Sequence, residues 1–210
     1  MVYLLTKLTI IPAIKLYVGK VNGLENIPRH GPFIAAANHV SYMDHLIIGA
    51  YLIPHLDKKI HFLAKKEHFD NILKKAWHIH AGAIPVDREK KGKKALRWAV
   101  KALKEGKVIA IHPEGTRSLT GRLQKAKTGV ARLALLAKVP VVPIGLIGTF
   151  EMLPKGKYFP RFTRATVNIG RPMHFSEYYN KKINKRMLRH VTTGIMKEIA
   201  KLSGQQYNYR

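Results

Sequence analysis

Residues 33–44 read FIAAANHVSYMD, and this stretch decides the fold because it places a polar turn directly after a short apolar run. The five apolar residues at its start are typical of a buried strand. Ser41 and Asp44 have the spacing of a helix capping box, which predicts that Ser41 is the N-cap of a helix over residues 42–52. The stretch therefore predicts a strand, a turn and a helix in close succession.

His39 lies in the predicted turn, five residues before Asp44. On one continuous helix the two side chains would diverge, but the predicted break lets Asp44 fold back toward the imidazole. A carboxylate on one ring nitrogen would fix the tautomer and raise the basicity of the other nitrogen, which makes a general base. The alternative is an ordinary capped helix with a surface histidine nearby, and this stretch alone leaves both open.

Short apolar runs alternate with helical patterns along the rest of the chain. Strands are predicted at 33–37, 60–64, 83–86, 108–111, 141–147 and 165–169, and helices at 42–52, 67–77, 90–104, 127–138 and 177–202. Such alternation is typical of an α/β fold with a mixed or largely parallel central sheet flanked by helices. The chain has 210 residues and no repeat or linker, so we predict a single domain over residues 21–210.

Charge is the unusual feature of the composition. Lys and Arg together number 38 and Asp and Glu only 12, a formal net charge of +26, while the hydrophobic content of 46% is that of a globular protein. The imbalance predicts a polyanionic partner, for which nucleic acid, an anionic membrane surface and phosphorylated substrates are the candidates. The sequence has no helix-turn-helix, zinc-finger or RNA-binding signature, so we expect no specific nucleic acid.

Residues 1–20 combine apolar and basic side chains. Their longest apolar stretch, 8–14, contains a proline and is far shorter than the roughly 20 residues that span a bilayer. Leucines and isoleucines flanked by Lys7, Lys15 and Lys20 suit a segment that lies in a membrane interface. The alternative is a helix that packs on its own core. We expect residues 1–20 to form an N-terminal membrane-interface helical segment.

Metal and nucleotide motifs are missing from the sequence. It has no cysteine, and its eleven histidines, His78 and His80 among them, form no H-E-x-x-H pattern. P-loop and dinucleotide fingerprints are also absent, as is the G-x-S-x-G nucleophile elbow. We therefore expect no metal and no cofactor. A histidine–aspartate pair without a serine or cysteine nucleophile favours direct transfer to a substrate hydroxyl that the histidine activates.

Polar clusters follow three of the predicted strands. Asn38 and His39 follow the first, Asp87 and Arg88 another, and residues 112–117, HPEGTR, a third. Ligands of α/β folds bind beyond the carboxyl ends of the strands, so these clusters are expected to converge on one cleft. Arg88 stands directly at the end of its strand, and we expect it to contact a phosphate.

The third cluster carries the richest set of candidate ligand groups. Gly115 lets the backbone approach a ligand, and Arg117 offers a planar fork of donors that suits phosphate. Thr116 supplies a hydroxyl. Glu114 would be costly beside a phosphate unless it pairs with an arginine or orients a substrate hydroxyl, so we assign it an orienting role. The alternative is an ordinary turn rich in polar residues.

Four blocks, in this order, resemble the 1-acylglycerol-3-phosphate acyltransferase family. They lie between about residues 23 and 170 and read Asn38-His39-x4-Asp44, Gly82-x3-Val86-x-Arg88, Pro113-Glu114-Gly115-Thr116-Arg117-Ser118 and Val139-Pro140-x2-Pro143. His112 departs from the family, which usually has Phe at that position, and residues 84–86 vary the second block. The fourth block reads as a stiff apolar strand, either core or the wall along which an acyl chain passes.

The resemblance implies transfer of a fatty acyl group from acyl-CoA or acyl-carrier protein to the free sn-2 hydroxyl of lysophosphatidic acid, giving phosphatidic acid without a covalent acyl-enzyme. Another lysophospholipid is the alternative acceptor. The resemblance implies His39 as general base and Asp44 as its partner, with a substrate site formed by Arg88, Glu114, Gly115, Thr116 and Arg117. Together with the basic composition, it leads us to expect a peripheral enzyme on the cytoplasmic face of the cell membrane, attracted by anionic lipid.

Overall fold

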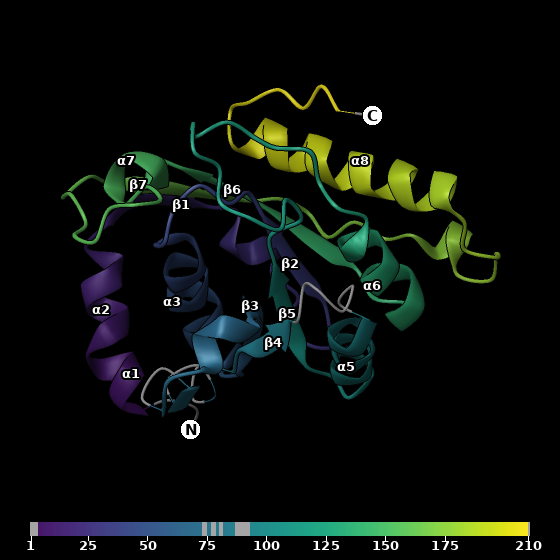
Figure 1. The fold of residues 1–210 in the computed structure, drawn as a ribbon, viewed down its shortest axis with the longest axis horizontal. Coiled ribbons are helices and arrows are strands. Elements are labelled where there is room, and N and C mark those ends of the chain that lie inside the picture. The colour runs from purple at the N-terminus through teal and green to yellow at the C-terminus, as the bar shows by residue number, and fades with distance from the viewer. Residues whose placement is uncertain (1–3, 73–74, 77–78, 80–81, 87–92, 210) are drawn as a thin grey trace.

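A mixed β-sheet forms the centre of the molecule and carries helices on both faces (Figure 1). The computed structural model describes residues 4–209 apart from 73–74, 77–78, 80–81 and 87–92. In that part of the chain the sheet has seven strands, which are β1 (Val18–Asn22), β2 (Ile34–Ala37), β3 (Ile60–Lys65), β4 (Ile84–Val86), β5 (Val108–Ile111), β6 (Val141–Ile147) and β7 (Ala165–Ile169). Their order across the sheet is β1-β7-β6-β2-β5-β3-β4.

Strand direction divides the sheet into two parts. The strands β6, β2, β5, β3 and β4 run parallel to one another, so their carboxyl ends meet at one edge. β7 runs antiparallel to β6, and β1 pairs in parallel with β7. The predicted α/β fold, a single domain with a mixed and largely parallel sheet, is confirmed.

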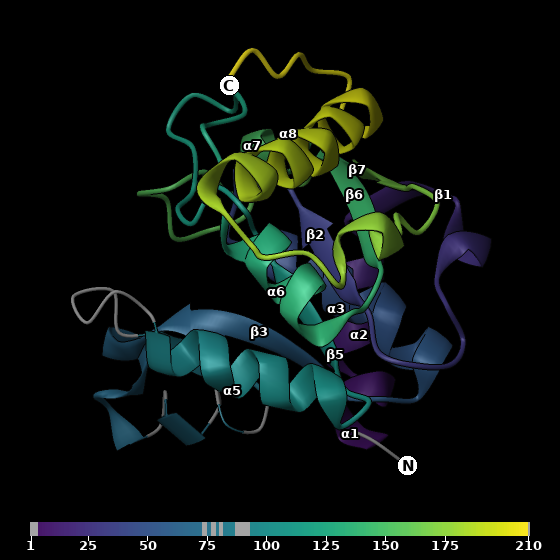
Figure 2. The same ribbon diagram turned by 90° about the vertical axis from the view of Figure 1, so that its right-hand side faces the viewer.

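Helices cover both faces of the sheet (Figure 2). They are α1 (Leu4–Leu8), α2 (Ile10–Lys15), α3 (Asp44–Leu56), α5 (Lys93–Lys104), α6 (Gly129–Ala137), α7 (Thr149–Met152) and α8 (Lys185–Leu202). Apolar side chains of α5, α6 and α8 form a core with one face of the sheet. Side chains of α3, joined by part of α2, form a second core with the other face.

Strand β2 shows why every one of its residues, 34–37, is apolar. Ile34 and Ala36 belong to the core under α5, α6 and α8, whereas Ala35 and Ala37 belong to the core under α3. All four side chains are fully buried. A central strand of a parallel sheet is covered on both faces, so it needs apolar residues throughout rather than in alternation.

Helix α8 begins later than the sequence pattern predicts. A helix was expected over residues 177–202, but only a 3₁₀ turn, Ser176–Tyr178, occupies the first part of that range. Asn184 then acts as the N-cap of α8, because its side-chain oxygen accepts a hydrogen bond of 2.9 Å from the backbone N–H of Met187. Asparagine is among the strongest N-cap residues, and the helix starts directly after it.

Other predicted helices agree with the structure to within a few residues where it describes them. The helix expected over 127–138 is α6, and the one expected over 90–104 is α5, whose predicted first residues lie outside the described part of the chain. The helix expected over 67–77 also falls partly outside it. A 3₁₀ turn, Lys66–Phe69, occupies its start, and Ile72, Lys75 and Ala76 are helical, with the N–H of Lys75 donating to the carbonyl of Asn71 at 2.7 Å.

Strand β1 was not predicted, and it begins inside the segment assigned to residues 1–20. It lies at the edge of the sheet, and most of its side chains are at least partly exposed. Gly19 and Lys20 stand among its residues, so it lacks the apolar alternation by which strands are recognised. A strand without a fully buried face needs no such pattern, because apolar alternation reflects burial of one face of the sheet.

Helices α1 and α2 precede this strand, and together they have one side buried against the domain and one side exposed. Ile11 is buried against the domain, while Leu4, Leu8 and Leu16 are exposed by 51%, 67% and 66%. The N-terminal segment therefore packs on the domain with one side and turns apolar side chains outward with the other. In the described part of the chain, no helix combines the length and the apolar character needed to cross a bilayer.

Candidate active site

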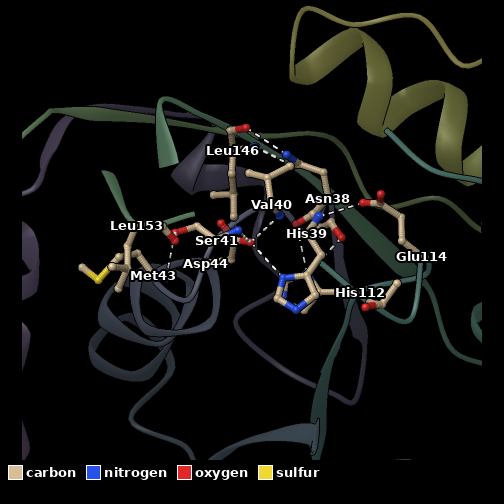
Figure 3. A network of polar contacts seen from close by, with 12 residues as sticks. Asn38, His39, Val40, Ser41, Met43, Asp44, His112, Glu114, Leu146 and Leu153 are labelled. Carbon is tan, nitrogen blue, oxygen red and sulfur yellow. Dashed lines mark hydrogen bonds and ion pairs between the residues drawn. The ribbon is translucent and has the colours of Figure 1, made fainter. Parts of the chain in front are cut away.

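The polar residues after β2 and β5 meet at the carboxyl edge of the sheet (Figure 3). Asn38 fixes this edge from within, because its amide donates to the carbonyl of Leu146 at 3.0 Å and accepts from the N–H of Leu146 at 2.8 Å. Asn38 is fully buried. It therefore continues the pairing of β2 with β6 by side-chain hydrogen bonds and sets the point at which the chain turns out toward His39.

Asp44 is the first residue of α3, and its carboxylate folds back over the preceding turn. Its Oδ2 accepts hydrogen bonds of 2.8 Å from the backbone N–H groups of Val40 and Ser41. The same oxygen lies 2.8 Å from Nδ1 of His39. The approach of Asp44 to His39 that the break in the helix predicts is therefore present, and the turn between the two residues is held by the carboxylate itself.

Ser41 is not the N-cap of this helix, so that prediction is wrong. The N-cap is Met43, whose side chain makes no capping hydrogen bond. The Ser41 hydroxyl instead donates to the carbonyl of Leu153 at 2.8 Å and accepts from the N–H of Met43 at 3.1 Å. The hydroxyl thus ties the turn to a distant segment, while the Asp44 carboxylate binds the N–H groups of Val40 and Ser41 within the turn itself.

The contact with Asp44 decides which nitrogen of His39 can act as a base. A carboxylate oxygen that already accepts two N–H groups is an acceptor, so the proton of the neutral imidazole lies on Nδ1 and the lone pair on Nε2. The His39 side chain keeps 18% of its surface exposed, whereas that of Asp44 is fully buried. The histidine can therefore contact a ligand, and the aspartate orients the imidazole ring through its Nδ1 side.

Burial raises the pKa of the Asp44 carboxyl. His112 and the backbone N–H groups of Ser41 and Val40 act in the opposite direction. The buried hydroxyl of Thr149, at the start of α7, also lowers this pKa. These protein groups offset only part of the cost of burying the charge of Asp44, because the net shift of its pKa is upward.

His112 lies directly against His39. The two rings stack with 3.9 Å between their centroids and 9° between their planes. Nδ1 of His112 lies 3.1 Å and 3.0 Å from the carbonyl oxygens of Ala37 and Asn38, which are acceptors only, so this nitrogen carries the proton. Burial lowers the pKa of His112 to about 3, and the ring is therefore neutral near pH 7.

Glu114 holds two backbone segments together and contacts no arginine in the described part of the chain. Its Oε1 accepts from the N–H of His39 at 2.7 Å, and its Oε2 accepts from the N–H of Gln124 at 2.8 Å. The residue is 3% exposed, and burial raises its pKa to about 7. We predicted an orienting role for Glu114, and in the structure the group that it orients is the backbone of His39.

The other residues of the third cluster take different positions. Gly115 has a φ of +75°, and a Cβ at this position would lie 3.2 Å from the side chain of Lys127. Thr116 is exposed, and its carbonyl accepts from the side-chain amide of Gln124 at 3.0 Å. The positive φ favours glycine at position 115, and Lys127 leaves little room for a larger side chain there.

Arg117 stacks on an aromatic ring beside the site. Its guanidinium carbon lies 3.3 Å from the ring centroid of Tyr42, which belongs to the turn between His39 and Asp44. Its Nη1 is buried and meets no hydrogen-bond acceptor among the described residues. The planar group is thus held by stacking, and the unpaired Nη1 can donate to a ligand once a shift of the side chain exposes it. Arg88, the other predicted phosphate ligand, lies outside the described residues.

A cavity of about 620 Å³ opens beside His39. Much of its wall is apolar and comes from β3, β4, β5, α5 and α6, through Leu63, Ala64, Val86, Leu96, Ile111 and Leu133. The rings of His39 and His112 and the cations Lys127 and Arg132 also line it. The strand of the fourth block, β6, is buried core and contributes no residue to this wall.

Three further residues belong to the site and were not predicted from the sequence, namely Lys127, Arg132 and Thr149. Lys127 precedes α6, which begins at Gly129, and Arg132 belongs to the first turn of this helix; both residues line the cavity. The helix over 127–138 was predicted, but nothing in its pattern shows that its first turn faces His39. Thr149 follows β6, and only the position of that strand beside β2 brings it to Asp44.

Among the described residues, no group of three or more histidine and acidic side chains is placed to hold a metal ion. The histidine pair His78 and His80 lies outside those residues.

Comparison with known proteins agrees with the four blocks. The Acyltransferase family model matches residues 19–147. A Bacillus subtilis protein named 1-acyl-sn-glycerol-3-phosphate acyltransferase is 34% identical over 176 residues, which are 80% of this chain and 80% of that protein. A chloroplastic protein of the same name from Arabidopsis thaliana is 32% identical over 77% of this chain, which corresponds to only 45% of its own length.

The fold also has a counterpart among solved structures. The crystal structure of the 1-acyl-sn-glycerophosphate (LPA) acyltransferase PlsC from Thermotoga maritima superposes with a TM-score of 0.69 at 25% sequence identity, and it covers 96% of this chain and 83% of that one. The chain therefore belongs to the acyltransferase family, together with the 1-acyl-sn-glycerol-3-phosphate acyltransferases that it resembles.

Proposed function

We propose that this enzyme transfers a fatty acyl group from acyl-CoA or acyl-carrier protein to the sn-2 hydroxyl of lysophosphatidic acid, giving phosphatidic acid. The names of its relatives support this acceptor. The observation that carries the mechanism is the 2.8 Å contact between Asp44 Oδ2 and His39 Nδ1, with the histidine at the wall of a cavity. This arrangement presents a base, rather than a nucleophilic side chain, to the substrates.

The proposed reaction needs one base and forms no acyl-enzyme. Nε2 of His39 takes the proton of the acceptor hydroxyl as its oxygen attacks the thioester carbonyl, and Asp44 stabilises the imidazolium that results. The new C–O bond forms, the C–S bond breaks, and the departing thiolate takes the proton from His39. A thioester is already an activated acyl donor, so the main task of the protein is to activate the alcohol and to position both substrates.

Cations around His39 supply the proposed phosphate contacts. Arg117 keeps donor capacity beside the turn, and we propose that it binds the phosphate of the acceptor, together with Arg88, Gly115 and Thr116. Lys127 lies against Gly115 and lines the cavity, so it can meet a phosphate of either substrate. Glu114 serves the substrate indirectly, because it fixes the backbone of His39.

The cavity beside His39 is the proposed place of the acyl chain. Its apolar wall and its volume of about 620 Å³ suit an alkyl chain, and the imidazole at its margin would meet the thioester end of that chain. Lys127 and Arg132 line the same cavity, so they can contact polar parts of the substrates there. Lipid substrates of this kind reside in membranes, so the enzyme is expected to work at a membrane surface.

We further propose a peripheral position on the cytoplasmic face of the cell membrane. The exposed side chains of Leu4, Leu8 and Leu16 would enter the interface, and the net charge of +26 would attract anionic lipid. An apolar element and a basic surface together suffice for stable anchoring without a spanning helix.

The direct test compares the wild type with His39→Ala in a mixture of lysophosphatidic acid, palmitoyl-CoA and anionic vesicles, with phosphatidic acid followed by mass spectrometry. We expect product from the wild type and a loss of at least about 10²-fold in turnover for His39→Ala, since a general base contributes that much or more. His30, an exposed histidine, offers the matched control His30→Ala. Near wild-type turnover of a folded His39→Ala would overturn the mechanism.

The same assay decides between acceptors and donors. Other lysophospholipids replace lysophosphatidic acid in parallel reactions, and acyl-carrier protein thioesters replace palmitoyl-CoA. Faster turnover of another lysolipid would identify the alternative acceptor with the chemistry unchanged. If every donor and acceptor remained inert with the wild type, the proposed substrate would be wrong.

A further inference from the structure

The segment that joins α7 to β7 exposes aromatic and basic side chains that no part of the proposed mechanism uses. Residues 153–164 read LPKGKYFPRFTR. Tyr158, Phe159 and Phe162 are exposed by 89%, 87% and 70%. The segment also carries four exposed cations and no acidic residue, the cations being Lys155, Lys157, Arg161 and Arg164. We call residues 153–164 the α7–β7 loop.

Backbone hydrogen bonds give this loop a definite shape. The N–H of Arg161 donates to the carbonyl of Met152 at 2.8 Å, which closes the base of the loop. Inside it, the N–H of Lys157 donates to the carbonyl of Pro154 at 3.2 Å. A hollow of about 360 Å³ lies within the loop, lined among others by Lys157, Tyr158 and Arg161. The loop therefore presents aromatic and cationic groups around one concave surface.

The loop continues the exposed apolar surface of the N-terminal helices. The ring of Phe162 packs against that of Tyr17, with 5.6 Å between centroids. Tyr17 directly follows Leu16, one of the exposed leucines after α2. Figure 1 shows the loop and α2 on the same side of the domain. Two segments that are distant in the sequence thus form one surface that combines apolar and basic groups.

The loop is also tied to the active-site turn. The carbonyl of Leu153, its first residue, accepts from the Ser41 hydroxyl at 2.8 Å and from the N–H of Tyr42 at 3.2 Å. Ser41 and Tyr42 stand between His39 and Asp44. Whatever surface the loop binds is therefore held at a fixed position relative to the catalytic turn.

We propose that the α7–β7 loop docks on the surface of an anionic bilayer and is a second membrane contact beside α1 and α2. Tyrosine and phenylalanine suit the boundary between headgroups and acyl chains, and lysine and arginine suit anionic headgroups. The occupant is an anionic bilayer because the loop carries cations only, together with bulky aromatic side chains at its tip. Docking itself does not depend on the proposed function. Only its benefit rests on that function, because docking would deliver a membrane lipid to His39.

Vesicle binding tests the proposal without any catalysis. Wild type and the double variant Tyr158→Ser/Phe159→Ser are sedimented with phosphatidylcholine vesicles that contain phosphatidylglycerol. We expect the double variant to bind at least about tenfold more weakly, since two large apolar side chains no longer enter the interface. Leu136→Ser removes another exposed apolar side chain, on α6, and should bind like the wild type.

The cations are tested separately. Lys155→Gln/Lys157→Gln should weaken binding to the anionic vesicles and reduce its dependence on salt, because fewer charges meet the headgroups. Lys181→Gln/Lys182→Gln removes the same charge from exposed positions before α8 and is the matched control. Equal losses in both pairs would show that net charge alone directs binding, and this would overturn the role of the loop.

Activity measurements separate the failure of this proposal from the failure of the proposed function. With a water-soluble short-chain lysophosphatidic acid and a short-chain acyl-CoA, Tyr158→Ser/Phe159→Ser should turn over like the wild type, while its activity on vesicle-bound acceptor should fall with its binding. His39→Ala should show the reverse, with normal vesicle binding and turnover reduced by at least about 10²-fold. An inactive wild type would overturn the proposed function, and vesicle binding would still decide the role of the loop.

Two outcomes would overturn the docking role. One is wild-type vesicle binding by a folded Tyr158→Ser/Phe159→Ser, with folding checked by thermal unfolding. The other is a change in oligomeric state of that variant by size-exclusion chromatography without a change in vesicle binding, which would make the loop an interface between copies of the chain.

Discussion

The imidazole rings of His39 and His112 lie in parallel contact, 3.9 Å apart, at the carboxyl edge of the sheet. His112 also donates from Nδ1 toward the carbonyls of Ala37 and Asn38, the two residues before His39. One side chain thus supports both the ring of the proposed base and the backbone that carries it. Because burial lowers the pKa of His112 to about 3, His39 gains its proton beside an uncharged partner.

His112→Phe tests whether this ring acts only by stacking. Phenylalanine keeps a flat ring of similar size, so we expect turnover to remain within about tenfold of the wild type. The lost hydrogen bonds to Ala37 and Asn38 should cost roughly 1–3 kcal/mol of unfolding free energy at pH 7, partly offset by burial of a more apolar ring. Turnover and urea unfolding of both proteins measure the two effects. A loss comparable to that of His39→Ala would show that His112 takes part in proton transfer.

His112→Phe should also change how the unfolding free energy depends on pH in the acid range. The folded pKa of His112 is about 3 and its ordinary value 6.5, so between these values the unfolded chain binds a proton that the folded protein does not. The unfolding free energy of the wild type therefore falls with falling pH, by up to about 1.4 kcal/mol per pH unit from this residue. His112→Phe lacks this contribution, so its stability relative to the wild type should rise below pH 6.5. Parallel stability curves would contradict the low pKa.

Glu114 should contribute to the unfolding free energy with a pH dependence opposite to that of His112, and Glu114→Gln tests this. Burial raises the pKa of Glu114 from 4.5 to about 7, so the folded protein holds a proton that the unfolded chain has released. The contribution of this residue is complete below pH 4.5 and is lost as the pH rises through 7, with a slope of up to about 1.4 kcal/mol per pH unit. Glutamine removes the slope. Urea unfolding at several pH values measures it, and an unchanged slope would contradict the raised pKa.

Glu114→Gln should also reduce activity. Glutamine has one acceptor oxygen, so either the N–H of His39 or that of Gln124 loses its partner. A buried N–H without a partner costs about 1–3 kcal/mol, and we expect turnover to fall by about tenfold as the His39 turn loosens. Gln124→Ala is the matched control, because it removes only the side-chain amide and leaves both hydrogen bonds from backbone N–H groups in place.

The part of the site that the sequence predicted is the part built from local chain. His39 and Asp44 meet because a strand, a turn and a helix follow one another within a few residues, and each of these has a sequence pattern. Glu114 reaches the backbone of His39 across 75 residues, and that contact depends on β5 lying next to β2. Strand order is not encoded in any local pattern, so the partner of Glu114 could not be read from the sequence.

In the fold, too, the elements with a local sequence pattern were predicted and those without one were not. Strands covered on both faces were predicted with nearly correct ends, because burial demands continuous apolar runs such as residues 108–111 and 141–147. Strand β1, exposed at the sheet edge, has no such demand and was missed. The start of α8 was misplaced because the predicted helix ran through Asn184, where a side-chain cap begins the helix.

Arg117→Lys tests the proposed phosphate contact. Lysine keeps the charge but loses both the stacked plane over Tyr42 and the fork of donors. We expect the KM for lysophosphatidic acid to rise by about tenfold, with kcat changed much less, because the group binds the acceptor without taking part in proton transfer. Arg122→Lys, at an exposed arginine nearby, should leave both constants unchanged. A KM equal to that of the wild type would remove Arg117 from the acceptor site.

Gly145→Ala tests the packing of α8 on the sheet that carries the site. A Cβ at Gly145, in β6, would lie 2.3 Å from the carbonyl carbon of Leu202 and 2.5 Å from the backbone nitrogen of Ser203. Both atoms belong to backbone at the end of α8, so relief requires the helix to move away from the strand. We expect a loss of about 3 kcal/mol in unfolding free energy, as for an overpacked core, measured by urea unfolding.

Gly194→Ala is the matched control, since it adds the same methyl group within α8 where nothing lies within 4 Å. Alanine favours a helix interior over glycine by roughly 0.8–1 kcal/mol, so this variant should be more stable than the wild type. Opposite signs for the two substitutions would show that the strand–helix contact, and not the added methyl group, sets the cost. If Gly145→Ala were as stable as the wild type, α8 could not lie as close to β6 as the structure places it.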